Sequence, residues 1–231
     1  MSTSQIVKLD GIIKDYSMGK NVFRALNKVN LSVDKGEFCG FVGPSGSGKT
    51  TLLNIIGALD NPTEGNALVL NRNVNEMTHK EAARLRNESI GFIFQTYNLL
   101  PVYTVYENVE FPLLLLKKNK AEREKAVMRA LEWVGLTSKA GSRPSQLSGG
   151  ESQRVAVARA MVKLPTIVLA DEPTANLDAA NSHNILKTMQ DLNREVGTTF
   201  IFATHDDKVI GYLRRKVVLN DGKIIDDINI N

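Results

Sequence analysis

A glycine-rich loop between an apolar run and a helical pattern constrains this chain more than any other feature of its sequence. Residues 38–42 are uniformly apolar, as expected of a strand that is buried on both faces. The next segment, 43–50, reads GPSGSGKT and fits the pattern G-x-x-x-x-G-K-[ST]. Helical periodicity follows over 51–59. This strand–loop–helix order predicts an α/β unit whose loop cradles phosphate groups.

Each part of this loop has a chemical reason. Glycines let the backbone N–H groups curl around phosphate oxygens. Lys49 supplies a cation to the β- and γ-phosphates, and the Thr50 hydroxyl is placed to bind Mg²⁺. An ordinary glycine-rich turn is the alternative, and both flanking elements argue against it, but the loop alone leaves kinases, GTPases and ATPases open. The predicted nucleotide contacts are Gly43, Pro44, Ser45, Gly46, Ser47, Gly48, Lys49, Thr50 and Thr51.

The rest of the chain alternates strand and helix patterns. Uniformly apolar runs predict buried strands at 38–42, 90–94, 167–170 and 199–203. Alternating apolar residues predict short antiparallel strands at 6–9, 29–33 and 67–70. Helical periodicity predicts helices at 51–59, 81–86, 121–134, 151–162 and 184–192. Strands that alternate with helices predict an α/β fold with a mainly parallel sheet, here with an N-terminal antiparallel β subdomain.

The middle of the chain shows helical patterns without a clear buried strand, which predicts a helical lobe inserted into the sheet. We expect one domain over 1–231, with a nucleotide-binding core of about 1–95 and 164–231 and a helical subdomain of about 96–163. Near the C-terminus, Asp221-Gly222 between two apolar runs predicts a hairpin turn.

Composition narrows the class of protein. The single cysteine, Cys39, rules out an internal disulfide and favours a cytosolic location. The apolar run at 113–116 is far shorter than the roughly 20 residues that a membrane-spanning helix needs. The net charge of +4, from 29 Lys plus Arg against 25 Asp plus Glu, is spread along the chain and gives little support to a nucleic-acid partner. We therefore expect a soluble chain, so that any membrane-spanning partner is a separate protein.

Two carboxylates, Asp171 and Glu172, directly follow the apolar run 167–170. Ligands bind outside the carboxyl ends of strands in open α/β sheets, so both acids are expected near the phosphate loop. Asp171 is suited to holding Mg²⁺, usually through water, and Glu172 to polarising an attacking water. A charged strand end before a turn is the alternative. GTP is disfavoured because the only sequence close to N-K-x-D, at 27–30, precedes the loop and lacks the acid.

A second anion site is predicted within 147–154, which reads LSGGESQR. The Ser148 hydroxyl and the backbone amides of Gly149 and Gly150 stand where a helix is expected to begin, and helix N-termini attract anions. Alone, this would be only a favourable helix start. The phosphate loop precedes this segment and the acidic strand end follows it. With the three elements in that order, the chain resembles the nucleotide-binding subunit of ABC transporters over nearly its whole length.

The resemblance implies a P-loop NTPase core of the RecA-like type that binds ATP and Mg²⁺ and hydrolyses ATP. It also implies a head-to-tail dimer, in which each ATP lies between Lys49 of one subunit and the segment Ser148, Gly149 and Gly150 of the other. The second subunit would be another copy or a homologous ATPase. Reopening of the pair after hydrolysis would drive a separate integral membrane subunit.

Four further residues match family motifs. In the family, the residue at Gln95 contacts Mg²⁺ and the attacking water and senses the membrane partner, and that at Asp178 reaches across the dimer interface. The one at His205 touches the γ-phosphate and holds the catalytic glutamate, and the one at Tyr16 stacks on adenine. Each residue also has a structural alternative. Gln95 would be a polar residue at a strand end, Asp178 a helix N-cap, His205 a structural histidine and Tyr16 an aromatic residue at a strand edge. The implied catalytic groups are Glu172, His205 and Gln95, and the implied magnesium ligands are Thr50, Gln95 and Asp171.

One position departs from the family pattern, because Glu151 stands where the signature usually has glutamine. An acid at this position lies near the predicted anion site. We therefore expect it to weaken closure of the dimer unless its side chain points to solvent.

Linker sequences narrow the resemblance further. Residues 52–65, 94–101 and 107–109 look like the bacterial lipoprotein-releasing and macrolide-export branch. In that branch the ATPase is peripheral, at the cytoplasmic side of the inner membrane, and pairs with a membrane subunit that bears a large extracytoplasmic domain. In the family, a groove near 94–101 receives a short helix of the membrane subunit. A loop before a helix is the alternative for that segment.

Two other functions stay open from the sequence. A cell-division ATPase of similar sequence controls wall hydrolases without transport, and the same motifs would serve it. A soluble ABC protein that acts on DNA or ribosomes is less favoured. Such proteins usually carry tandem cassettes, coiled coils or zinc modules, whereas this chain has one cassette and one cysteine. We expect no nucleic-acid partner.

Overall fold

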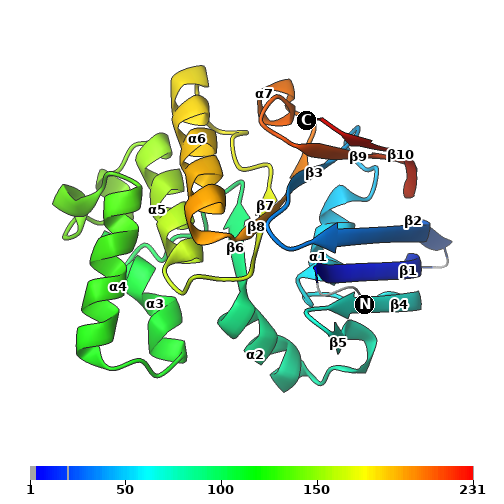
Figure 1. Ribbon diagram of the computed structural model, residues 1–231, viewed down its shortest axis with the longest axis horizontal. Helices are drawn as coiled ribbons and strands as arrows, with labels where there is room; N and C mark the ends of the chain where they lie inside the picture. The colour runs from blue at the N-terminus through cyan, green and yellow to red at the C-terminus, as the bar shows by residue number, and fades with distance from the viewer. Residues whose placement is uncertain (1–3, 20, 231) are drawn as a thin grey trace.

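The computed structural model describes residues 4–19 and 21–230 and arranges them around two β-sheets (Figure 1). One sheet has four strands in the order β2-β1-β4-β5, and the other has six in the order β10-β9-β3-β8-β7-β6. In Figure 1 the four-stranded sheet lies at the right, and helices α3, α4 and α5 lie together at the left. Within these described ranges, no helix is both long enough and apolar enough to cross a membrane.

The four-stranded sheet is antiparallel. Its strands are β1 (Gln5–Met18), β2 (Asn21–Asp34), β4 (Glu64–Val69) and β5 (Arg72–Asn73). The antiparallel strands predicted from alternation fall in β1, β2 and β4, but β1 and β2 extend much further. Their pairing contains register shifts, for example between Leu9 and Ile12. Each shift moves the following side chains to the other face, so the alternation breaks and hides the rest of the strand.

The six-stranded sheet carries the predicted site at one edge. Its strands are β3 (Phe38–Val42), β6 (Ile90–Phe94), β7 (Ile167–Asp171), β8 (Thr199–Thr204), β9 (Arg215–Asn220) and β10 (Lys223–Asn229). All neighbours are parallel except β9 and β10. The predicted buried strands and the terminal hairpin at Asp221-Gly222 are confirmed. The parallel order brings the carboxyl ends of β3, β6, β7 and β8 to the same edge.

The predicted helices are present with shifted ends. The α-helices are α1 (Lys49–Ile56), α2 (His79–Ser89), α3 (Val105–Leu115), α4 (Lys120–Trp133), α5 (Gly149–Met161), α6 (Ala179–Val196) and α7 (Asp207–Ile210). The part of the chain that the structure describes also contains the short 3-10 helices η1 (Val74–Glu76), η2 (Thr137–Lys139) and η3 (Pro144–Gln146). Helix α1 ends at Ile56 rather than Leu59 because Gly57 caps it and Ala58 turns to a φ of +50°.

Helix α3 was not predicted from the sequence. Pro112 lies in its interior, and proline usually ends a helix. The helix begins at a capping box, in which the Thr104 hydroxyl accepts from the Glu107 N–H and the Glu107 carboxylate accepts from the Thr104 N–H. Thr followed three residues later by Glu is a recognised signal for a helix start. The signal was present in the sequence, but the apolar run that follows it obscured the periodicity.

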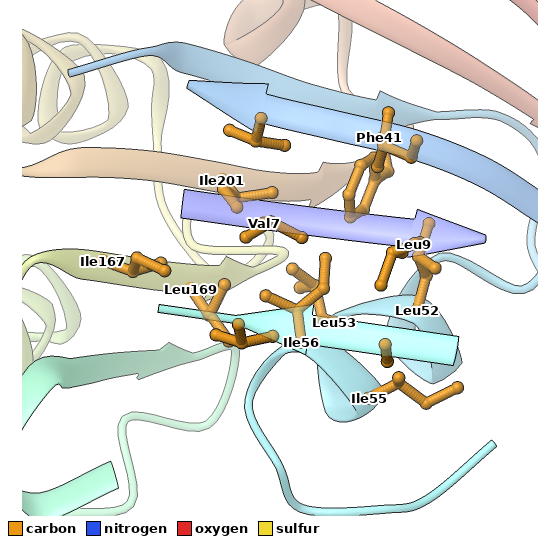
Figure 2. Close-up of a cluster of buried hydrophobic side chains, with 14 of the residues drawn as sticks. Val7, Leu9, Phe41, Leu52, Leu53, Ile55, Ile56, Ile167, Leu169 and Ile201 are labelled. Atoms are coloured by element: carbon orange, nitrogen blue, oxygen red, sulfur yellow. The ribbon is translucent and has the colours of Figure 1, made fainter. Parts of the chain in front are cut away.

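Two clusters of buried apolar side chains join the layers. In the first, side chains of α1 meet those of β1 and of the six-stranded sheet, among them Leu52, Val7 and Phe41 (Figure 2). The second packs α3, α4, α5 and α6 on the other face of that sheet, where Phe200 and Phe202 are fully buried. The division of the chain at residues 95 and 164 stays a prediction.

Candidate functional site

The phosphate loop, residues 43–48, leaves β3 and enters α1 at the carboxyl edge of the six-stranded sheet. Gly43 and Gly48 have φ values of +154° and +102°. A Cβ on Gly43 would lie 2.1 Å from the Leu219 carbonyl oxygen, and one on Gly48 would lie 2.6 Å from that of Ala25. Only glycine therefore fits these two positions. Helix α1 begins without a side-chain cap among the described residues, so its first N–H groups are free to bind an anion.

Lys49 folds back across this loop. Its Nζ donates to the carbonyl oxygens of Gly43 at 2.7 Å and Pro44 at 2.8 Å. Burial lowers the pKa of Lys49, and the nearby carboxylates of Glu172 and Asp171 act in the opposite direction. The backbone and the two acids thus hold a cation at the mouth of the loop, where a bound phosphate would replace the carbonyl contacts.

The loop borders a cavity of about 380 Å³. Groups from several distant segments converge on it, and its lining is Phe23, Ala25, Ser45, Gly46, Gly48, Lys49, Thr50, Thr51, Gln95, Asp171, Glu172 and His205. The predicted residues Gly43, Pro44 and Ser47 shape the loop but are outside this lining. Phe23 and Ala25 were not singled out from the sequence, because they belong to the part of β2 that the broken alternation concealed.

Thr50 and Asp171 supply the oxygen atoms of a candidate magnesium site. The Thr50 hydroxyl donates to Asp171 Oδ1 at 3.1 Å. Burial raises the pKa of Asp171, whereas the Thr50 hydrogen bond and Lys49 lower it. Mg²⁺ prefers oxygen ligands and is usually bound by one or two carboxylates together with substrate phosphates. Among residues 4–19 and 21–230, no group of three or more His, Cys, Asp or Glu side chains could hold a metal by itself, so this pair fits an ion that is shared with phosphates.

Glu172 is held by residues at the end of β8. Its Oε2 accepts from the Thr204 hydroxyl at 3.0 Å, and its Oε1 lies 2.6 Å from His205 Nδ1. Its backbone has a φ of +45°, and its N–H donates to the Ala203 carbonyl at 2.9 Å. Such a conformation persists where the surroundings over-determine it, which is common at functional sites. A carboxylate fixed at the cavity in this way can accept a proton from an attacking water.

Gln95 lines the cavity from the end of β6, and the chain turns sharply after it. Tyr97 and Asn98 have φ values of +60° and +48°. Arg159 of α5 donates to the carbonyl oxygens of Tyr97 at 2.7 Å and Asn98 at 2.5 Å. The Asn176 side chain donates to the Gln95 carbonyl at 2.9 Å. The Arg159 bonds tie the segment after Gln95 to α5, and the Asn176 bond ties Gln95 to the loop between β7 and α6. No sequence pattern pointed to Arg159, because its partners are backbone atoms about sixty residues away.

The helix start predicted in the signature is present at α5. Ser148 caps the helix, with its Oγ accepting from the Glu151 N–H at 3.2 Å. Gly150 is tightly packed, because a Cβ there would lie 2.4 Å from Asn181 Oδ1. The Asp178 carboxylate, which caps α6, accepts from the backbone N–H and the side-chain amide of Asn181 at 2.8 and 2.6 Å. The signature and Asp178 are thus neighbours, and neither belongs to the lining of the 380 Å³ cavity.

Tyr16 lies at the margin of the cavity. It pairs with Phe23 across β1 and β2, and Phe23 lines the cavity. The Tyr16 hydroxyl donates to Asp60 Oδ2 at 2.9 Å, and Asp60 Oδ1 accepts from Lys14 at 2.6 Å. Burial raises the pKa of Tyr16, and a hydrogen bond with Thr51 lowers it. The ring is therefore fixed next to a lining residue, and its stacking on adenine stays a prediction.

Comparison with known proteins decides the family. Residues 26–175, more than half of the chain, match the family model for the ABC transporter. The chain belongs to this family. As an ABC cassette, it is an ATPase that binds ATP with Mg²⁺.

Two similar proteins cover almost the whole cassette. The uncharacterised ABC transporter ATP-binding protein MJ0796 of Methanocaldococcus jannaschii is 43% identical over 223 residues, which span 95% of each chain. The uncharacterised ABC transporter ATP-binding protein YvrO of Bacillus subtilis is 45% identical over 222 residues, which span 96% of each chain.

Solved structures agree with the fold of the cassette. A dimeric structure of MJ0796 in a post-hydrolysis state, bound to ADP and Pi, matches with a TM-score of 0.90 at 41% identity and covers 97% of this chain and 99% of that one. CbiO1 from Clostridium perfringens, part of the ABC transporter complex cbiONQ, matches with a TM-score of 0.88 at 30% identity, over 98% of this chain and 89% of that one. The predicted P-loop NTPase fold with an antiparallel subdomain is confirmed.

Proposed function

We propose that the cassette works as a head-to-tail pair that closes on ATP and drives a membrane subunit. Each ATP lies between a phosphate-loop half-site of one subunit and a signature half-site of the other. The phosphate-loop half-site comprises residues 43–50, Gln95, Asp171, Glu172 and His205, and the signature half-site comprises Ser148, Gly149 and Gly150. The observation that carries the proposal is the position of α5, whose start offers anion-binding groups outside the cavity of its own chain. Dimeric structures of MJ0796 support the pairing.

In this pair the residues of the cassette have distinct roles. Lys49 and the N–H groups of the loop bind the β- and γ-phosphates. Thr50 and Asp171 hold Mg²⁺, which neutralises phosphate charge when it is bound. Glu172 accepts the proton of the attacking water, and His205 keeps its carboxylate in place. Loss of the γ-phosphate removes the anion that the two half-sites share, so the pair reopens.

A mainly apolar groove fits the membrane subunit. It has a volume of about 490 Å³, lies among α2, β6, α3 and α5, and includes Phe94, Asn98 and Leu100 of the segment 94–101. Leu115 of α3 also lines it and is 58% exposed. A short amphipathic helix buries its apolar face in grooves of this kind. The groove adjoins the segment that follows Gln95, so a docked helix has a direct connection to the ATP site.

We assign the cassette to the lipoprotein-releasing and export branch, peripheral at the cytoplasmic side of an inner membrane. Its partner is an integral membrane subunit with an extracytoplasmic domain. The resemblance of the linker segments supports this branch, and the relative cbiO1, as part of a transporter complex, supports a membrane partner. Purification of the complex from membranes tests the assignment. If the membrane subunit binds a wall hydrolase instead, the result would favour the alternative function, in which the ATPase controls wall hydrolases without transport.

Glu172→Gln tests the catalytic assignment. The variant keeps the shape of the side chain but removes the base, so we expect hydrolysis to fall on the order of 100-fold or more. ATP should still bind and should hold the variant as a closed dimer, which light scattering detects. Glu132→Gln, at an exposed position on α4, is the matched control. Normal turnover in Glu172→Gln would overturn the role of Glu172, and a variant that stays monomeric with ATP would overturn the pairing.

A further inference from the structure

Glu151, the residue that departs from the family signature, turns back onto the start of α5 instead of pointing to solvent. Its Oε2 accepts from the Ser148 N–H at 2.8 Å, while the Ser148 hydroxyl accepts from the Glu151 N–H at 3.2 Å. The Ser148 N–H hydrogen bond holds the pKa of Glu151 below its ordinary value. A charged carboxylate is therefore fixed within the first turn of the helix, beside the groups that form the signature half-site.

The cation that faces this carboxylate is Lys139. Its Nζ lies 3.5 Å from Glu151 Oε1. Lys139 ends η2, and its backbone is fixed on both sides, because its N–H donates to the Leu136 carbonyl at 3.0 Å and its carbonyl accepts from Ser142 at 2.9 Å. The Ser142 carbonyl in turn accepts from the Val105 N–H at the start of α3, at 2.8 Å. These bonds fix the main chain of Lys139 at a place from which its side chain reaches the acid.

We propose that Lys139 is a positioning residue of the signature half-site, which neutralises Glu151 so that the capping acid does not repel the ATP phosphates of the partner subunit. The inference rests on the head-to-tail pair proposed above. Glu151 holds Ser148 in its capping geometry, but an uncompensated carboxylate at a helix N-terminus opposes the approach of a second anion. The ion pair keeps the cap and removes the net charge.

The size of the effect follows from exposure. The side chains of Lys139 and Glu151 are 41% and 21% exposed, so water and salt screen the pair. We expect loss of the Lys139 charge to weaken each ATP sandwich about threefold. A symmetric pair contains two such sites, so ATP-driven dimerisation should weaken about tenfold. Binding of ATP to the monomer should not change, because Lys139 is outside the cavity lining.

The test is a double-mutant cycle in the Glu172→Gln protein, with the dimer dissociation constant in ATP measured by sedimentation velocity. Lys139→Gln should weaken the dimer about tenfold when Glu151 is present and have no effect when it is combined with Glu151→Gln. Lys139→Arg should preserve the dimer, and the Lys139→Gln effect should shrink as salt rises. Lys125→Gln, at an exposed position on α4, controls for the loss of one positive charge.

Each other outcome contradicts the inference. Dimerisation that is unchanged in Lys139→Gln would show that the ion pair has no role. An equal loss with and without Glu151→Gln would show that Lys139 acts independently of the acid. A Glu172→Gln protein that does not dimerise with ATP at all would overturn the head-to-tail pair, and this inference with it.

Discussion

The phosphate-loop half-site and the signature half-site hold their groups in different ways. In the first, side chains from the start of α1 and from the ends of β7 and β8 bond one another, as Thr50 does with Asp171 and His205 with Glu172. In the second, the predicted anion-binding groups come from one helix start, where Ser148 and Glu151 form a capping box and Glu151 also pairs with Lys139. The first half-site lines a cavity within one chain, whereas the second does not. We infer that one chain is sufficient to bind ATP, whereas hydrolysis requires two chains.

The largest expected effect comes from breaking the phosphate-loop half-site. Lys49→Ala removes the cation that bonds to the loop carbonyls and would bind the β- and γ-phosphates. Without Lys49, the charge-assisted hydrogen bonds to the β- and γ-phosphates cannot form, so ATP affinity should fall on the order of 100-fold. Titration with a fluorescent ATP analogue measures this directly. Affinity within about threefold of the unaltered chain would show that Lys49 does not bind phosphate.

Breaking the signature half-site should leave ATP binding intact. Gly150→Ala places a Cβ 2.4 Å from Asn181 Oδ1, and the Asn181 amide cannot move freely because it donates to Asp178 at 2.6 Å. The resulting shift of α5 should reduce ATP-driven dimerisation and hydrolysis about tenfold or more. Gly141→Ala, where a Cβ would meet open space, is the matched control. A loss of ATP affinity in the Gly150→Ala monomer would contradict the separation of the two half-sites.

The smallest expected effect concerns the adenine end of the first half-site. Tyr16→Ala removes the ring and should weaken ATP binding by about tenfold, whereas Tyr16→Phe keeps the ring and loses the hydrogen bonds of the hydroxyl with Asp60 and Thr51. Tyr16→Phe should therefore differ from the unaltered chain by about twofold or less. Equal losses in the two variants would assign the effect to the hydroxyl and argue against stacking.

The first half-site could be predicted from the sequence far more fully than the second. Its motifs are continuous in the chain, and each follows an apolar strand whose carboxyl end must reach the same sheet edge. Lys49, Asp171 and Glu172 were therefore expected together, and they share one cavity. The buried strands could also be predicted correctly, because a strand that is buried on both faces appears in the sequence as a continuous apolar run.

The surroundings of the second half-site could not be predicted, because its neighbours come from distant segments without a pattern. Lys139 lies in the short helix η2, and Asn181 lies in the first turn of α6, before the predicted helix at 184–192, so no periodicity pointed to their contacts with the start of α5. The sequence also left open whether the Glu151 side chain points to solvent. Only its conformation in the structure answers this, and that conformation depends on the capping box and on Lys139. Helix α3, whose first residues bond to the segment that follows η2, was itself hidden by Pro112 and by the apolar run around it.

The most direct test of the central claim is a cross-link between the two half-sites. In the Glu172→Gln background, one preparation carries Ser45→Cys in the loop and another carries Ser148→Cys in the signature, both at exposed positions. The native Cys39 does not interfere, because it is buried and burial raises its pKa. A short bis-maleimide linker should yield covalent dimers in the mixture, only with ATP, and none in either preparation alone. A mixture that gives no ATP-dependent dimer, or a single preparation that cross-links to itself, would contradict the head-to-tail pair.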